Sequence, residues 1–174
     1  MDGTGIYTWP GGSHLARELP RLIPWPPGAL RCADLGCGAG ICGRSLMTAG
    51  GANVVFCDGD PAALAAVQIA LPGADTRLHV WGTPLPDGPY DLILGGDILY
   101  RAAFHPALLA SLASSLAPEG LALLSDPRTT LEEELPFLAQ NCGLSWHAER
   151  RDQGYTLVRL KRFTPHAPVK NPLA

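Results

Sequence analysis

The sequence predicts an α/β fold built on a doubly wound, mostly parallel sheet of seven strands that ends in an antiparallel hairpin. Two observations carry this prediction. Short apolar runs alternate along the chain with helix-compatible stretches, which is typical of a parallel sheet covered by helices on both faces. Near the C-terminus, two apolar segments flank Asp152-Gln-Gly154, a turn signal that places one antiparallel strand in the sheet.

A single domain is expected, because 174 residues suffice to bury one full core. We place this domain at 1–162 and a Pro-rich flexible tail at 163–174. The net charge of −3 indicates no nucleic-acid partner, and no apolar run reaches membrane length. The 5 cysteines form no C-x-x-C pair and the histidines are scattered, so we expect no metal site. A monomer in the reducing cytoplasm is the resulting expectation.

The first strand and the turn after it are the organising feature of the chain. An apolar run ends at Leu35, glycines follow at Gly36, Gly38 and Gly40, and a helix-compatible stretch covers 41–49. Glycines let the chain turn sharply and let a ligand lie against the main chain. In open α/β sheets ligands dock at such strand-to-helix junctions, so we predict a binding site here.

Asp34 lies two residues before the first of these glycines. Its carboxylate would repel an anionic pyrophosphate at the following helix N-terminus, whereas it suits a ligand with ammonium and sulfonium groups. However, Gly38-Ala-Gly-Ile-Cys-Gly43 also satisfies the G-x-G-x-x-G pattern of NAD and FAD folds, with Asp58 at a plausible distance for a ribose-binding acid. A purely structural turn is the third interpretation, and these residues alone leave all three open.

A second buried strand is predicted at 52–57, and it runs into Asp58-Gly-Asp-Pro61. An acid at this strand end suits paired hydrogen bonds to ribose hydroxyls, but it also suits a helix cap. Asp60, with Pro61 at the first helical position, already serves as the cap of a helix over 61–70. We therefore predict that Asp58, with the adjoining Gly59, binds the ligand.

The other elements follow from the same alternation. Further strands are expected at 76–80, 90–96, 121–124, 144–149 and 155–161, and helices at 13–19 and 104–116. Ser13 is the expected cap of the first helix, and Pro20 is expected to end it. The last helix begins either at Thr130, through a capping box with Glu133, or near Glu134.

Three stretches resemble a known family. Asp34-Leu-Gly-Cys-Gly-Ala-Gly40 resembles motif I of the class I S-adenosylmethionine (SAM) methyltransferases, which have a Rossmann-like sheet. The segment from Trp9 to Leu19 resembles the Trp-containing segment ahead of motif I in the seven-β-strand protein-lysine methyltransferases, including the bacterial electron-transfer-flavoprotein lysine methyltransferases. The segment from Asp91 to Tyr100 resembles their Asp-x-x-Tyr/Phe motif, so the likeness extends from Trp9 to Lys161.

This resemblance implies a function. It implies an enzyme that moves a methyl group from SAM to a neutral nitrogen, with a protein lysine as the leading acceptor. A small-molecule acceptor is the nearest alternative, because the same fold and motifs serve both. A catalytically weak SAM-fold binding module and an NAD-linked oxidoreductase are the hypotheses from other classes.

The resemblance also implies site residues. Asp97 would orient the attacking amine and Tyr100 would lie beside it; alternatively, Asp97 caps the following helix and Tyr100 only packs. Trp81 either contacts the adenine or packs in the core. Trp9 either walls the ligand mouth with Tyr7 or packs its helix onto the sheet. The implied cofactor-binding residues are Trp9, Asp34, Gly36, Cys37, Gly38, Gly40, Asp58, Gly59, Trp81, Gly96 and Asp97.

Overall fold

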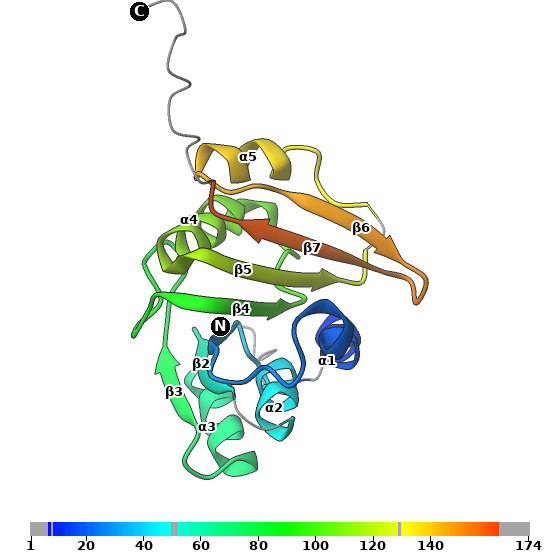
Figure 1. The fold of residues 1–174 in the computed structure, drawn as a ribbon. Coiled ribbons are helices and arrows are strands. Elements are labelled where there is room, and N and C mark those ends of the chain that lie inside the picture. The colour runs from blue at the N-terminus through cyan, green and yellow to red at the C-terminus, as the bar shows by residue number, and fades with distance from the viewer. Residues whose placement is uncertain (1–6, 8, 50–51, 129, 164–174) are drawn as a thin grey trace, which may run out of the picture.

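A seven-stranded sheet forms the centre of the computed structural model, which describes residues 7, 9–49, 52–128 and 130–163 (Figure 1). In chain order the strands are β1 (Arg31–Leu35), β2 (Asn53–Asp58), β3 (Asp75–Leu78), β4 (Tyr90–Gly96), β5 (Leu116–Asp126), β6 (His147–Arg151) and β7 (Tyr155–Lys161). The helices are α1 (Pro10–Leu22), α2 (Ile41–Thr48), α3 (Pro61–Ala70), the short 3₁₀ helix η2 (Ala102–Phe104), α4 (His105–Ser115) and α5 (Leu135–Asn141).

The strand order is β3-β2-β1-β4-β5-β7-β6. The strands from β3 through β5 pair in parallel, whereas β7 is antiparallel to both β5 and β6. The predicted doubly wound, Rossmann-like sheet with a C-terminal antiparallel hairpin is therefore confirmed. The chain builds outward from β1 to β3 and then crosses to β4 on the other side of β1. This reversal is the switch point at which open α/β sheets bind ligands.

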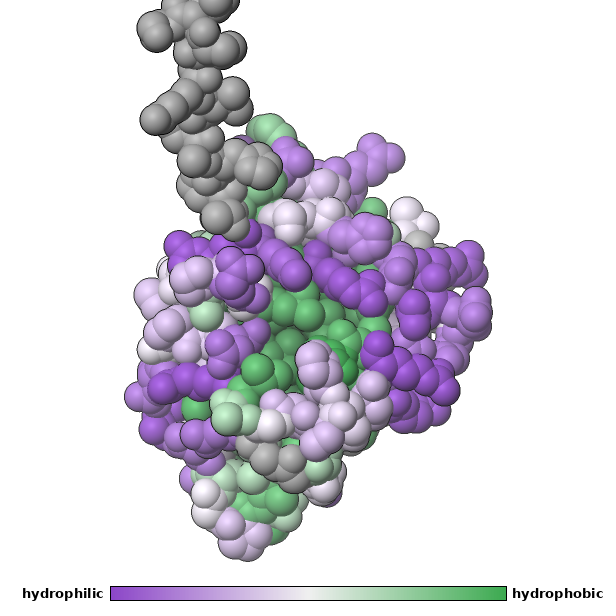
Figure 2. Space-filling view, in the orientation of Figure 1, coloured by the Kyte–Doolittle hydropathy of each residue, from purple (hydrophilic) through white to green (hydrophobic). Residues whose placement is uncertain are grey.

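The two faces of the sheet bury separate hydrophobic clusters. Leu15, Leu46 and Val67 bring α1, α2 and α3 onto one face, whereas Leu109 and Leu135 bring α4 and α5 onto the other. Consecutive strand residues alternate between the clusters because strand side chains point to opposite faces. In Figure 2, hydrophobic side chains gather over β4 and β5 beside α1, and hydrophilic side chains frame them.

The helix α1 begins earlier and ends later than the sequence predicted. It starts at Pro10, which suits the first helical position because its missing N–H has no intrahelical partner there. It also continues through Pro20 to Leu22. Pro20 cannot donate to the carbonyl of Ala16, and the hydroxyl of Ser45 in α2 donates to that carbonyl instead, at 3.1 Å. The neighbouring helix thus compensates for the proline, and the predicted end at Pro20 is wrong.

Several other predicted boundaries also differ from the structure. The strand β5 begins at Leu116, which the sequence had assigned to the preceding helix. The helix α5 has Glu134 as its N-cap, so the start near Glu134 is confirmed and the capping box at Thr130 is wrong. The strand β3 ends at Leu78 and β6 begins at His147, where the sequence predicted 76–80 and 144–149.

Some expectations concern parts of the chain that the structure does not describe. Apart from Phe163, the predicted tail at 163–174 lies outside the described residues. The expectation of a single domain at 1–162 stays a prediction. None of the helices described is long and apolar enough to cross a membrane.

Candidate functional site

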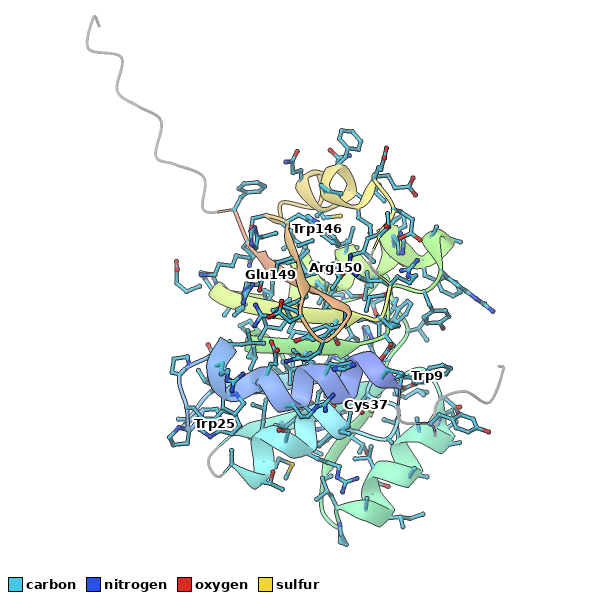
Figure 3. The ribbon with its side chains drawn as sticks, turned by 90° about the vertical axis from the view of Figure 1, so that its right-hand side faces the viewer. Trp9, Trp25, Cys37, Trp146, Glu149 and Arg150 are labelled. Atoms are coloured by element: carbon cyan, nitrogen blue, oxygen red, sulfur yellow. The ribbon has the colours of Figure 1, made fainter. Side chains whose placement is uncertain are left out.

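A pocket lies at the carboxyl ends of β1 and β4, which are neighbours in the sheet at its switch point. Figure 3 shows Trp9 at the start of α1 and Cys37 near the same helix, whereas Trp146, Glu149 and Arg150 lie apart from them around β6. The pocket is lined by residues of α1, the glycine turn, α2 and the end of β4: Tyr7, Trp9, Gly12, Asp34, Gly36, Cys37, Gly38, Ala39, Ile41, Cys42, Gly96 and Asp97.

The glycine turn has the backbone conformation that the sequence predicts. Gly36, Gly38 and Gly40 have φ angles of 62°, 50° and 73°, in the left-handed region that favours glycine. The turn is also tightly packed, since a Cβ on Gly36 would lie 2.8 Å from Cγ2 of Ile98. A side chain at these positions would therefore shift the loop as well as strain its backbone.

Asp34 is buried at the floor of this turn. Its Oδ2 accepts a hydrogen bond of 2.8 Å from the N–H of Gly43 in the first turn of α2. Burial raises the pKa of Asp34 to about 7, and the nearby Asp58 adds to the rise, although the hydrogen bond from Gly43 opposes it. A cation that entered the pocket would favour the ionised form of this carboxyl group.

Asp58 holds the glycine turn from the end of β2. Its Oδ2 accepts from the N–H of Gly38 and its Oδ1 from the N–H of Asp60, both at 2.9 Å. Burial raises the pKa of Asp58, although these hydrogen bonds oppose the rise. Asp60 in turn accepts from the N–H of Ala62 at 2.9 Å, so the predicted cap of α3 is confirmed. Asp58 and Gly59 do not line the pocket; Asp58 reaches it through Gly38.

Asp97 follows β4 and contacts the start of α1. Its Oδ2 accepts a hydrogen bond of 2.9 Å from the N–H of Gly12, in the first turn of that helix. The alternative that Asp97 caps the following helix is wrong, because the N-caps of η2 and α4 are Arg101 and Phe104 and neither helix has a side-chain cap. Burial raises the pKa of Asp97 and Asp126 adds to the rise, while the hydrogen bond from Gly12 opposes it.

Tyr100 and Trp81 lie outside the pocket lining. Tyr100 is 53% exposed, and the guanidinium of Arg101 lies 5.8 Å from its ring centroid. Trp81 packs partly buried against the hydrophobic cluster of α4 and α5, with its ring edge-on to Phe104 at 5.8 Å. The indole also borders the glycine turn, since a Cβ on Gly36 would lie 3.8 Å from its Cζ2. The roles proposed for Tyr100 and Trp81 stay predictions.

The structure brings other predicted residues together and adds new ones. Trp9 lies in the pocket wall with Tyr7, their rings 6.5 Å apart, as the ligand-mouth interpretation expects. Gly12, Ile41 and Cys42 also line the pocket, although the sequence did not predict them as site residues. A usable signal for Gly12 was its place after Pro10, a residue suited to open a helix.

The thiols at the site are unreactive in this environment. Burial raises the pKa of Cys37 and Cys42, and the charge of Asp34 adds to the rise in both. Both side chains therefore stay protonated and act as small apolar groups. Within the described ranges, no cluster of three or more His, Cys, Asp or Glu residues could hold a metal ion.

Comparison with known proteins gives one family and several relatives. The family described as "methyltransferase domain" matches residues 12–164. The chain is 37% identical to protein N-lysine methyltransferase METTL21A of Danio rerio, over 63% of this chain and 55% of that protein. It is 33% identical to trans-aconitate 2-methyltransferase of Methylobacterium nodulans, over 72% of this chain and 46% of that protein. The chain thus spans about half the length of these curated relatives.

The fold also matches solved structures. A TehB-like SAM-dependent methyltransferase from Corynebacterium glutamicum superposes with a TM-score of 0.73, covering 90% of each chain. The sequence identity of that pair is 18%, so the likeness concerns the fold. The fold of the chain thus recurs in a solved methyltransferase structure.

Proposed function

The chain belongs to the methyltransferase domain family, and from that membership we propose that it is a SAM-dependent N-methyltransferase whose acceptor is a lysine side chain of a protein. Support for SAM comes from the family and from the resemblance of Asp34 to Gly40 to motif I. Support for lysine comes from the METTL21A relative and from the Asp-x-x-Tyr segment that ends at Tyr100.

One observation carries the proposal: a buried carboxylate lies beside a glycine turn at the switch point of the sheet. A ligand with an ammonium group would stabilise the ionised form of Asp34 and lower its raised pKa. A dinucleotide would instead bring a pyrophosphate against that carboxylate and the N-terminus of α2. The SAM interpretation therefore agrees with the charge of the pocket.

Residues in and around the pocket would each contact one part of SAM. Asp34 would hold the amino group of its methionine portion, and Gly36, Cys37, Gly38 and Gly40 would let this portion lie along the main chain. Asp58 would accept hydrogen bonds from the ribose hydroxyls, because each of its oxygens has a second lone pair beyond the bond it already accepts. Gly59 would border the ribose, and Trp81 would lie against the adenine.

The chain's own residues would then orient the acceptor. When bound, SAM supplies an activated methyl group on a sulfonium leaving group. Asp97, at the end of β4, would hold the acceptor nitrogen through Oδ1 and take its proton, and the neighbouring Gly96 would border the cofactor. Trp9 would exclude water from the wall of the pocket, and Tyr100 would lie beside the acceptor on the approach side. Orientation is the main contribution of the protein.

A small-molecule acceptor is the second candidate. The trans-aconitate methyltransferase relative favours it, and so does the position of Arg101. Its guanidinium lies 5.8 Å from the ring of Tyr100 and 5.7 Å from that of Phe104, just beyond Asp97 in the chain. A cation at this place would favour an acceptor that carries a carboxylate over a strongly basic peptide.

Transfer from methyl-labelled SAM tests the proposal. The purified protein is incubated with labelled SAM and a dialysed lysate, and in parallel with the small-molecule fraction of the same lysate. We expect label in a protein band that yields methyl-lysine on hydrolysis, and a small residual fraction of that label with Asp97→Ala. Label confined to the small-molecule fraction would instead support the second candidate. The expectations of a monomer and of a cytoplasmic location stay predictions.

A further inference from the structure

The main chain in the first turn of α1 packs directly against the main chain at the end of β4. A Cβ on Gly96 would collide with Cα of Gly12, and a Cβ on Gly11 would lie 2.7 Å from Oδ2 of Asp97 and 2.9 Å from its Cγ. Contacts this short do not occur for real side chains. Glycine at these positions is therefore what allows the helix to approach Asp97.

The side chain of Asp97 caps the N-terminus of α1, although Asp97 lies 85 residues after Gly12 in the sequence. Its own N-cap residue, Trp9, makes no side-chain cap hydrogen bond. An N-cap side chain usually accepts from the second or third helical N–H, and here the third, that of Gly12, donates to Oδ2 of Asp97. The helix thus fixes the position of this carboxylate.

The backbone of Asp97 supports a specific role for this arrangement. Its φ angle is 58°, in the left-handed region that non-glycine residues rarely adopt. Its N–H donates to the carbonyl of Ser125 at 2.8 Å, so the adjoining strand β5 holds this conformation. Backbone outliers of this kind concentrate at functional sites, where the surrounding structure maintains them.

The two carboxylate oxygens of Asp97 differ. Oδ2 accepts from Gly12, whereas Oδ1 is buried and has no hydrogen-bond partner among the described residues. A buried acceptor without a partner costs free energy, which a hydrogen bond from a ligand would recover. Asp97 also lines the pocket, so its carboxyl group borders the space from which an acceptor would approach.

We propose that Gly11 and Gly12 are positioning residues for methyl transfer: the first turn of α1 binds Oδ2 of Asp97 and thereby directs Oδ1 to the acceptor nitrogen. This inference rests on the proposed function, and it makes the N-terminal helix part of the reacting site. Neither glycine touches the reacting atoms in this proposal, because both act through Asp97.

The variant Gly11→Ala tests the role of the turn. Its new Cβ must displace the carboxylate, so transfer of label from SAM should fall by about 100-fold, the effect of a misplacement of about 1 Å. The affinity for S-adenosylhomocysteine, measured by calorimetry, should change far less than the transfer rate. Ser13→Ala is the matched control, since it lies in the same helix and its hydroxyl contacts the carbonyl of Trp9 at 3.4 Å. An equal effect of both variants would overturn the inference.

A double-mutant cycle asks whether Gly11 acts through Asp97. In the Asp97→Ala background the carboxylate is absent, so Gly11→Ala should cause no further loss of transfer. Independent, multiplicative losses would contradict the inference. They would mean that Gly11→Ala acts by another route, such as a general disturbance of α1.

Exchange of the Gly12 amide hydrogen separates this inference from the proposed function. In the wild-type protein this amide donates to Asp97, so Asp97→Ala should accelerate its exchange by about tenfold or more. Unchanged exchange would overturn the inference even if the protein transfers methyl groups. Accelerated exchange in a protein that neither binds S-adenosylhomocysteine nor transfers label would instead overturn the proposed function.

Discussion

At the scale of single residues, the site depends on carboxylates that are held by main-chain N–H groups. Asp34 accepts from Gly43, Asp58 from Gly38 and Asp97 from Gly12. Burial raises the pKa of all three, so each carboxylate is less stable in its ionised form than it would be in water. Carboxylates perturbed in this way concentrate at functional sites.

Asp34→Asn should stabilise the free protein at high pH. The folded pKa of about 7 lies above the usual value of a carboxyl group, so the ionised side chain destabilises the fold above pH 7. This penalty fades as the pH falls from 7 to about 4. The variant should therefore gain about 4 kcal/mol at pH 8 and almost nothing at pH 4. Urea unfolding at both pH values measures it, and a loss of stability at pH 8 would contradict the prediction.

The same carboxyl group should make SAM binding depend on pH. A bound ammonium group favours the ionised form of Asp34, so binding below pH 7 must release a proton. The association constant should rise with pH up to about 7, by as much as about tenfold per pH unit, and then level off. Calorimetry in two buffers of different ionisation enthalpy detects the released proton. No release in wild type, or the same release in Asp34→Asn, would argue against this role.

At the scale of elements, the glycine turn depends on how closely α2 lies against β2. A Cβ on Gly43 would lie 2.5 Å from Cε1 of Phe56 and 2.9 Å from Cγ1 of Val54. Gly43 is also the donor to Asp34. One glycine therefore sets both the distance between the helix and the strand and the position of the carboxylate.

Gly43→Ala should destabilise the protein although alanine is the better helix former. The gain in helix propensity is about 1 kcal/mol, whereas overpacking of a buried contact costs about 1–3 kcal/mol. Because the neighbours are an aromatic ring and a strand side chain, we expect a net loss of about 1–2 kcal/mol in urea unfolding. Arg44→Ala, at the next and exposed position of α2, is the control and should change stability by less than about 0.5 kcal/mol. Equal stability of the two variants would contradict the packing argument.

The elements also show what the sequence could predict. Parallel strands end at the same edge of a sheet, so the positions of Asp34, Asp58 and Asp97 follow from recognising three strands. The start of α1 is harder to predict, because Pro10 suits the first helical position but the two glycines that follow it are typical of irregular chain. That start is fixed by a carboxylate far along the sequence, and the continuation through Pro20 by the hydroxyl of Ser45.

The sequence also could not predict where side chains point in the segment that follows a strand. The spacing from Asp97 to Tyr100 predicted two residues at one site, but only Asp97 lines the pocket. The positive φ of Asp97 redirects the chain immediately after β4, and no local pattern signals it. Tyr100 consequently lies exposed beside Arg101.

At the scale of the whole molecule, the N-terminal helix is fastened to the C-terminal hairpin. Glu18 of α1 is buried and pairs at 2.8 Å with Arg151 of β6. Burial would raise the pKa of Glu18, but its polar neighbours, among them the hydrogen-bonded and charged Arg151, outweigh it and lower the pKa. The ring of His14 also stacks on Tyr155, with centroids 4.9 Å apart. The helix that holds Asp97 at its first turn is thus also anchored to the hairpin of β6 and β7.

Arg151→Ala should weaken this anchor by leaving Glu18 buried without its cation. Removing one partner of a buried pair costs about 3–5 kcal/mol, and since Arg151 is partly exposed we expect about 2 kcal/mol at pH 7. The loss should shrink as the pH falls through the lowered pKa of Glu18, because the protonated acid no longer needs a cation. Arg150→Ala, at the neighbouring exposed position, is the control. Equal losses at pH 7 and pH 3 would contradict the ion-pair explanation.

Calorimetric titration with SAM, S-adenosylhomocysteine and NAD tests the central claim most directly. We predict that the two adenosyl ligands bind with dissociation constants on the order of 1–100 μM, that NAD does not bind, and that Asp58→Ala abolishes binding. The variant Asp75→Ala, on the neighbouring strand β3, is a matched control that should bind as wild type. Binding of NAD without binding of either adenosyl ligand would mean that the role of Asp34 has been misassigned, and would overturn the account.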